Sequence, residues 1–174
     1  HIALSWFTFT LNGVKLLRHT GGTHGQTTLL VFAPEEQYAL VVLTNSSDGD
    51  GVIDAAETSA LQQYLGVSIP QPSPLDLPAN QLEPYTGSFE SGDASCRIEL
   101  AEDRLVLHMA FKGGFPTPEA PAPPPQPPAS MALYEPDKFF VLDGSMKGSR
   151  GEFLRDDQGR VAWLRIDGRV RYRN

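Results

Sequence analysis

The amino-acid sequence predicts an α+β protein in two parts, and three observations support this prediction. In residues 3–44, strand-like segments alternate with turn signals. In residues 52–65, apolar residues recur at the spacing of a helix. Residues 82–174 return to short strand-like segments. We therefore expect antiparallel strands with a helix in residues 1–66, a proline-rich linker over 67–79, and a small antiparallel β-barrel-like domain over 80–174.

The first part reads as an antiparallel meander. Val, Leu, Thr and aromatic residues are concentrated in four segments, which are residues 3–11, 14–19, 27–33 and 38–44. Asn12-Gly13 is a strong hairpin signal between the first two, and residues 34–37 separate the last two in a similar way. Leu40 to Leu43 is a continuous apolar run, which predicts a strand covered on both faces.

A helix and a linker are expected next. Ile53, Ala56, Ala60, Leu61 and Leu65 fall at helical spacing, and Gly66 is a residue type that often ends a helix. Prolines at positions 70, 72, 74 and 78 prevent regular strand pairing in the segment that follows. We expect a domain boundary in this segment.

The second part has about eight short strand-like segments, which is typical of a small barrel or sandwich. They lie at residues 85–90, 95–101, 104–111, 131–135, 138–142, 151–155, 161–166 and 169–173. Eight of the thirteen positions in 116–128 are proline, so this insertion is expected to protrude from a hairpin as a spacer. A ligand for a proline-recognition domain is the alternative interpretation of the insertion.

Composition excludes several classes of site. Cys96 is the only cysteine, which rules out an intrachain disulfide and a multi-cysteine zinc site. No apolar run approaches the roughly 20 residues that a membrane helix needs. The sequence starts at His1, which suggests a fragment or a processed product. The net charge is −7, although residues 145–174 are basic. Because Arg169, Arg171 and Arg173 alternate with apolar or aromatic residues, we interpret them as part of a two-faced strand and expect no nucleic-acid partner.

The segment Arg18-His19-Thr20-Gly21-Gly22-Thr23-His24-Gly25 is the strongest candidate for a functional site. Its glycines allow close approach to the backbone, and its threonines and amide groups can hold an oxyanion or a carboxylate. A flexible glycine turn is the alternative interpretation.

Together with its neighbours, this segment resembles the class-C-β-lactamase-like family of serine hydrolases, which includes penicillin-binding carboxypeptidases and esterases. The resemblance covers about residues 3–66. It rests on Trp6, His19-Thr20-Gly21-Gly22-Thr23-x-Gly25, Leu29-Leu30-Val31-Phe32, Pro34-Glu35 and Val41-Val42-Leu43-Thr44-Asn45. It implies that the chain is the C-terminal part of such a hydrolase, secreted or periplasmic, acting on a β-lactam, peptide or ester through an acyl-enzyme.

The resemblance also implies roles for individual residues. His19, Thr20 and Gly21 would form the substrate wall, and the N–H group of Gly22 would help to hold the oxyanion. His24 and Gln26 depart from the family pattern, and the chain contains no Ser-x-x-Lys nucleophile. The chain alone is therefore expected to be inactive, and its expected partner is the N-terminal part of the same hydrolase.

The second part resembles the lipocalin-like barrel appended to some of these hydrolases. The resemblance rests on Leu82, Tyr85, Gly87 and Phe89, and on Gly159-x-Val161-x-x-Leu164. It implies an accessory domain at the catalytic cleft. Retention of an apolar ligand in the barrel is a second possibility.

The alternative to an enzyme is a non-enzymatic binding module, either through that barrel or through calcium. Oxygen-bearing and apolar residues from 46 to 57 follow the spacing of a calcium-binding EF-hand loop. The candidate ligands are Ser46, Asp48, Asp50, Val52, Asp54 and Glu57. The segment before them is a predicted strand and not a helix, so a polar turn that caps the helix remains the other interpretation. No other cofactor is expected.

Overall fold

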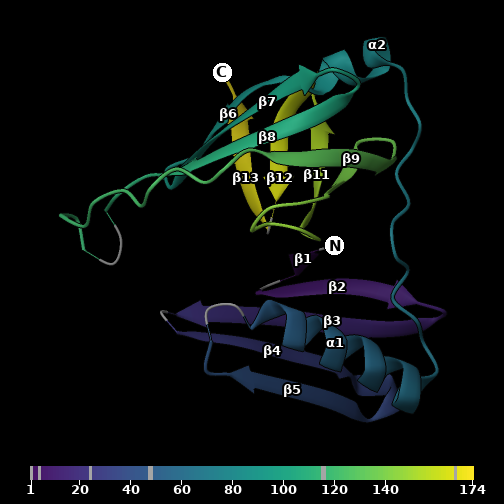
Figure 1. Cartoon of the computed structure of the whole chain (residues 1–174). Helices are drawn as coiled ribbons and strands as arrows, with labels where there is room; N and C mark the ends of the chain where they lie inside the picture. The colour runs from purple at the N-terminus through teal and green to yellow at the C-terminus, as the bar shows by residue number, and fades with distance from the viewer. Residues whose placement is uncertain (1, 4, 24, 47–48, 115–116, 167) are drawn as a thin grey trace. The chain divides into compact units, whose positions relative to one another are not determined.

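The computed structural model describes residues 2–3, 5–23, 25–46, 49–114, 117–166 and 168–174. The chain divides into two compact units, His1–Gln71 and Pro72–Asn174 (Figure 1). The α+β class is confirmed, with mostly antiparallel strands and few helices. No helix in these described ranges is long and apolar enough to span a membrane.

The first unit contains an antiparallel meander, as the turn spacing predicts, with five strands in place of the expected four. Its strands, in spatial and sequence order, are β1 (Ile2–Ala3), β2 (Trp6–Leu11), β3 (Val14–Thr23), β4 (Gln26–Ala33) and β5 (Tyr38–Thr44). Asn12 and Gly13 connect β2 to β3 with φ values of 48° and 89°. Positive φ at both turn residues is the requirement of a tight hairpin turn whose twist matches the strands. A short 3₁₀ turn, η1 (Pro34–Glu36), connects β4 to β5.

One helical segment covers one face of this sheet (Figure 1). It consists of α1 (Asp50–Ala60) and a wider π-helical turn, η2 (Leu61–Leu65), and Gly66 ends it with a left-handed φ of 66°. Ile53, Glu57 and Leu61 recur every fourth residue and are buried on the side that faces the sheet. The core of the unit comprises Leu16, Leu29, Val31, Ala33, Ile53, Leu61 and Val67.

The opposite face of the sheet is open within this unit. Val41 and Leu43 are 60% and 74% exposed, whereas Leu40 and Val42 pack against the core. The expectation that residues 40–43 are covered on both faces is therefore wrong for the unit as described. The physical reason is that α1 covers only one face, and successive side chains of a strand point to opposite faces.

Residues 66–78 form neither a helix nor a strand. The beginning of this segment belongs to the first unit, where Val67 is buried and Ile69 packs against the core. The end belongs to the second unit, where the N–H group of Leu75 donates to the carbonyl oxygen of Leu133 at 2.7 Å and Leu77 packs against the barrel core.

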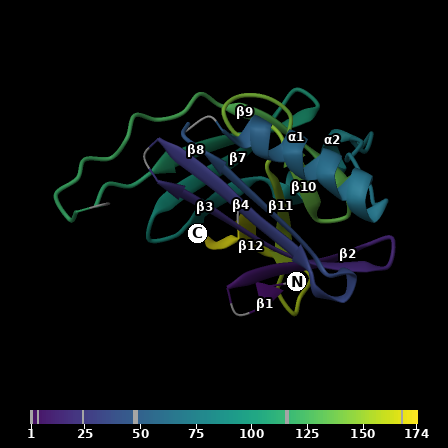
Figure 2. The ribbon, with the colours of Figure 1, turned by 90° about the horizontal axis from the view of Figure 1, so that it is seen from below.

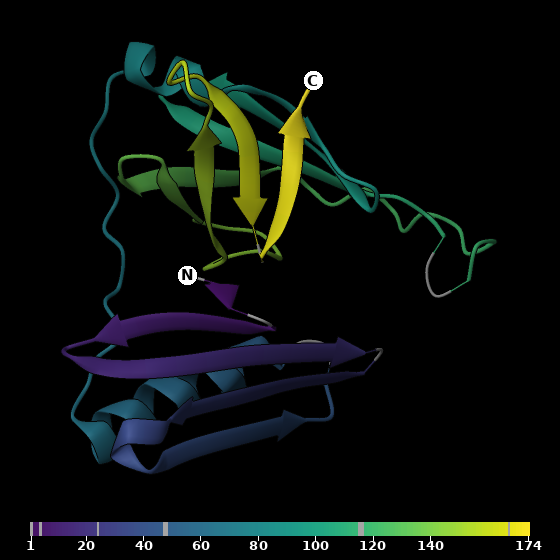
Figure 3. The same ribbon diagram turned by 180° about the vertical axis from the view of Figure 1, so that it is seen from behind.

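The second unit is a closed eight-stranded barrel, as predicted from the number and spacing of the strands (Figures 1 and 3). A short helix, α2 (Ala79–Leu82), and a 3₁₀ turn, η3 (Glu83–Tyr85), precede it. The barrel strands are β6 (Gly87–Glu90), β7 (Ala94–Ala101), β8 (Arg104–Phe111), β9 (Ala129–Glu135), β10 (Lys138–Val141), β11 (Arg150–Arg155), β12 (Val161–Ile166) and β13 (Arg169–Arg173). Each strand pairs antiparallel with the next, and pairing of β13 with β6 closes the ring.

The connection between β8 and β9 extends away from the barrel (Figures 1 and 2). Residues 117–128 contain no helix or strand, because proline lacks the N–H group that a strand needs. The hydroxyl of Ser145 donates to the side-chain oxygen of Gln126 at 2.6 Å and attaches the end of this connection to the barrel.

Candidate functional site

The strand β3 carries all four residues of the predicted substrate wall, His19, Thr20, Gly21 and Gly22. Its pairing with β2 ends at Arg18, whereas its pairing with β4 continues to Thr23. In the described pairing, residues 19–23 therefore have a strand partner on one side only. Because backbone polar groups of alternate residues point to opposite sides of a strand, some of these groups have no strand partner in the described pairing.

A shallow hollow of about 350 Å³ lies beside this edge on the open face of the sheet. Its floor and rim are mostly apolar and carry no Lys, Arg, Asp or Glu side chain. The lining residues are Ser5, Trp6, His19, Gly21, Thr28, Leu29, Leu30, Val41 and Leu43. The Trp6 ring meets the rings of His19 and Phe32 edge to face, with centroid distances of 5.8 Å and 4.9 Å.

The four wall residues do not share one face of the sheet. His19 and Gly21 line the hollow, whereas Thr20 and Gly22 do not, because neighbouring side chains of a strand alternate between faces. A Cβ at Gly21 would lie 2.9 Å from the hydroxyl of Thr28, so glycine suits this cross-strand contact. His24 lies outside the described residues.

A partly buried ion pair attaches β3 to α1 on the other face. The Arg18 guanidinium donates from Nε to Oε1 of Glu57 at 3.0 Å and from Nη2 to Oε2 at 3.2 Å. Glu57 is 3% exposed. Sequence reasoning gave Glu57 as a candidate calcium ligand and missed its pairing with Arg18, because the pair joins residues 39 positions apart.

In this structure Glu57, the last candidate calcium ligand, is engaged by Arg18. Glu57 would have to leave Arg18 in order to bind a metal, and Asp48 lies outside the described residues. Gly49, which precedes α1, packs so closely that a Cβ would overlap the hydroxyls of Thr27 and Thr44. Among the described residues, no group of three or more His, Cys, Asp or Glu side chains is placed to hold a metal ion.

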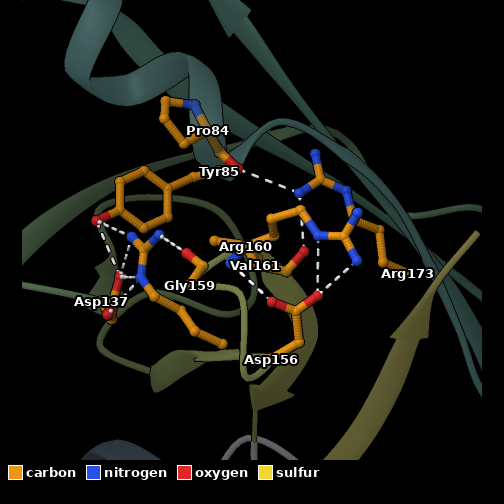
Figure 4. Close-up of polar contacts among 9 residues, drawn as sticks. Pro84, Tyr85, Asp137, Asp156, Gly159, Arg160, Val161 and Arg173 are labelled. Carbon is orange, nitrogen blue, oxygen red and sulfur yellow. Dashed lines mark hydrogen bonds and ion pairs between the residues drawn. The ribbon is translucent and has the colours of Figure 1, made fainter.

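A second polar cluster lies at one end of the barrel (Figure 4). Arg155 donates from Nη2 to Oδ1 of Asp137 at 2.6 Å and from Nε to Oδ2 at 2.9 Å, and the Tyr85 hydroxyl donates to Oδ1 at 3.0 Å. The Arg155 hydrogen bonds, followed by that from Tyr85, hold the pKa of Asp137 below its usual range. Since these groups satisfy one another, we interpret the cluster as structural. No sequence motif indicated it.

Comparisons with known proteins identify similar folds. No protein-family model matches the chain, and no curated protein matches it. A structure described as "Crystal structure of SurE with D-Leu" matches with a TM-score of 0.62 and 22% identity, over 97% of this chain and 38% of that one. A second SurE crystal structure matches with a TM-score of 0.60 and 21% identity, over 97% of this chain and 36% of that one. This chain thus spans less than two fifths of the SurE chains it matches.

These comparisons correct the family assignment made from the sequence. The two SurE structures match this chain at about a fifth of the residues, and at this identity they show the fold alone. The octameric penicillin-binding protein homologue from Pyrococcus abyssi matches with a TM-score of only 0.32, which carries no argument. The assignment to the β-lactamase, penicillin-binding protein and esterase family was wrong, as was the serine-hydrolase function inferred from it. The binding-module alternative, with calcium or an apolar barrel ligand, receives no support either.

Proposed function

We propose that this chain is the ligand-contacting portion of a larger SurE-like protein. In this proposal, the hollow beside β3 accepts a small amino acid, or one residue of a larger ligand, with an aliphatic side chain. The observation that carries the proposal is the combination of an apolar hollow with an unpaired strand edge. The likeness to a SurE structure described as containing D-Leu adds a specific ligand to test.

The apolar part of the hollow suits an aliphatic side chain. Trp6, Leu30 and Leu43 supply apolar surface around it, and Leu43 is 74% exposed in the unit as described. Covering such surface with a ligand side chain is favourable by about 25 cal/mol for each Å² of apolar area removed from water. A charged ligand side chain would find no fixed opposite charge among the lining residues.

The polar edge suits the carboxylate of an amino acid. The imidazole of His19 is exposed on the rim, and the backbone of residues 19–23 offers N–H donors on the side that β2 leaves free. Backbone donors held by a sheet are already oriented, so they bind an anionic group with little reorganisation. Glycine at positions 21 and 22 lets a ligand approach these donors closely.

The test is a titration of the isotope-labelled 174-residue chain with D-leucine, followed through backbone amide NMR shifts. We expect saturable shifts in residues 19–23 and 28–30. Leu43→Ser should weaken binding about fivefold, because it removes roughly 1 kcal/mol of apolar contact. Val52→Ser is the matched control, since Val52 is 62% exposed on α1 and does not line the hollow.

D-Glutamate serves as the ligand control and should bind more weakly than D-leucine, because its charged side chain gains nothing from the apolar floor. The proposal fails if D-leucine gives no saturable shift at β3 and β4. Equal affinities of the wild type and Leu43→Ser would also contradict it.

A further inference from the structure

The connection between β8 and β9 is longer than the barrel topology requires. The two strands are neighbours in the barrel and run antiparallel, with Leu107 paired to Ala129. A turn of two residues can join such strands, whereas residues 112–128 separate the end of β8 from the start of β9. Loops of this length are uncommon in compact domains and are usually functional or disordered. Closure of the barrel therefore does not explain the presence of this connection.

A proline-rich segment of this connection, residues 121–125, is held on both sides. Before it, the N–H group of Gly114 donates to the carbonyl oxygen of Ala120 at 2.8 Å. After it, the side chain of Gln126 accepts from the Ser145 hydroxyl at 2.6 Å, which attaches the chain to the barrel. Because both ends are already held, binding of a partner to this segment costs less ordering entropy than binding to a free chain.

Proline determines the backbone conformation of the segment. Its sequence is Pro-Ala-Pro-Pro-Pro. Each proline fixes its own φ at about −65° and keeps the residue before it in the extended or polyproline-II region. The segment contains no helix or strand, so we interpret it as a short polyproline-II helix, which has three residues per turn. Pro121 and Pro124 consequently lie on the same side of it.

This side of the segment is free to contact a partner. Pro121 and Pro124 are exposed, whereas Pro125 and Gln126 line a hollow of about 430 Å³ beside β6, β7 and β8. In the described part of the chain, no hydrogen bond to the carbonyl oxygens of residues 121–125 is present. The segment therefore offers two proline rings together with unused backbone acceptors.

The charge beside the segment restricts the kind of partner. Glu119 is exposed, and it is the only charged residue in 117–128. A groove with an acidic rim would repel Glu119, whereas a basic rim would attract it. The rings of Pro121 and Pro124 present apolar surface of the kind that aromatic grooves bind. A partner groove should therefore combine aromatic side chains with a basic rim.

We propose that residues 119–125 are a docking segment for a protein domain that binds polyproline-II helices in an aromatic-lined groove with a basic rim. Recognition of this kind uses a preformed helix whose conformational entropy is already low. The surface lies in the second unit, and the interaction is independent of the ligand proposed for the hollow beside β3.

The test is an NMR titration of the labelled 174-residue chain with three proline-binding domains, one each of the SH3, WW and EVH1 classes. We expect saturable shifts of the amides of Ala120, Ala122 and Gln126, since proline itself has no amide hydrogen. The domain with the most basic groove rim should bind most tightly, and Glu119→Lys should weaken that complex. The proposal is overturned if none of the three domains produces saturable shifts, or if the domain with the most acidic rim binds most tightly.

Pro124→Ala should weaken binding about tenfold, because it removes one of the two exposed rings that anchor the segment. Pro74→Ala is the matched control, since Pro74 is exposed in the other proline-rich segment, and it should leave the affinity unchanged. Both positions are exposed and lie outside helices and strands, so both variants should fold. Equal affinities of the wild type and Pro124→Ala would show that the domain binds elsewhere and would overturn the proposal.

Discussion

Tyr85, Asp137 and Arg155 come together at one end of the barrel although Tyr85 and Asp137 are 52 residues apart in the chain. Tyr85 is buried and its ring lies 5.6 Å from the Arg155 guanidinium, so the ring and the carboxylate hold the same cation. Asp137 occupies a left-handed turn position with φ of 63°, a conformation that aspartate and asparagine adopt more readily than most residues. Both the backbone conformation and the carboxylate at this position therefore have a structural role.

We predict that Asp137→Asn lowers stability at neutral pH and removes part of its dependence on acid. The pKa of Asp137 is depressed in the folded state, so its ionised form contributes stability above the unfolded pKa near 3.9. That contribution is lost as pH falls through the lower, folded pKa. Urea unfolding of both proteins at several pH values from 7 down to 2.5 measures the difference.

The Asn substitution keeps the left-handed turn, so the loss should reflect the charge together with the second acceptor oxygen that Arg155 uses. The stability difference between the wild type and Asp137→Asn should shrink as pH falls below about 4. A difference that stays constant over the whole range would show that Asp137 does not contribute through its charge.

At the scale of elements, β3 does two different tasks on its two faces. Arg18 pairs with the helix α1 on one face, and His19 lines the hollow on the other. The alternation of side chains along a strand separates these tasks by a single residue. The position of α1 on the sheet therefore supports the strand that carries the proposed ligand site.

We predict that Arg18→Met destabilises the first unit by about 3 kcal/mol, because it leaves the buried Glu57 carboxylate without its partner. Arg18→Met combined with Glu57→Met should recover much of that loss, since two apolar side chains replace the pair. Chemical denaturation of the two single variants and the double variant provides the coupling energy. Additive losses in the double variant would contradict a direct interaction.

At the scale of the whole molecule, the two units have separate hydrophobic cores. The barrel core is centred on buried residues such as Phe89, Phe139 and Leu164, and none of its members belongs to the core of the first unit. Strand pairing is likewise confined within each unit in the described register. Each unit therefore has the internal contacts that an independently folding domain requires.

We predict that residues 72–174 fold when expressed alone, because pairing of β13 with β6 closes the barrel and the described barrel core lies within the unit. Dispersed NMR spectra and a single cooperative thermal transition would support this. The full chain should retain the amide shifts of the isolated barrel for most of residues 87–173. An unfolded fragment would show that the first unit is needed for barrel stability.

The sequence alone determined the identity and order of most elements. Alternating apolar residues, the turn at Asn12-Gly13 and the helix end at Gly66 are local signals, and local backbone preferences decide these features. The number of strands in residues 82–174 was sufficient to predict a small barrel or sandwich. The sequence also singled out residues 19–22 of β3, and their role in binding stays a prediction.

The tertiary structure decided which side chains meet and which face is covered. Only the fold brings Arg18 to Glu57 and thereby engages a residue that the local pattern assigned to calcium. Only barrel closure shows that Arg171 points inward while Val170 and Tyr172 point outward, against their hydropathy. The short motif around His19 led to the wrong family, because a glycine-rich segment between two strands is compatible with many sheets. Local patterns depend on neighbours in the chain, whereas ion pairs, burial and ligand sites depend on contacts between residues that are distant in sequence.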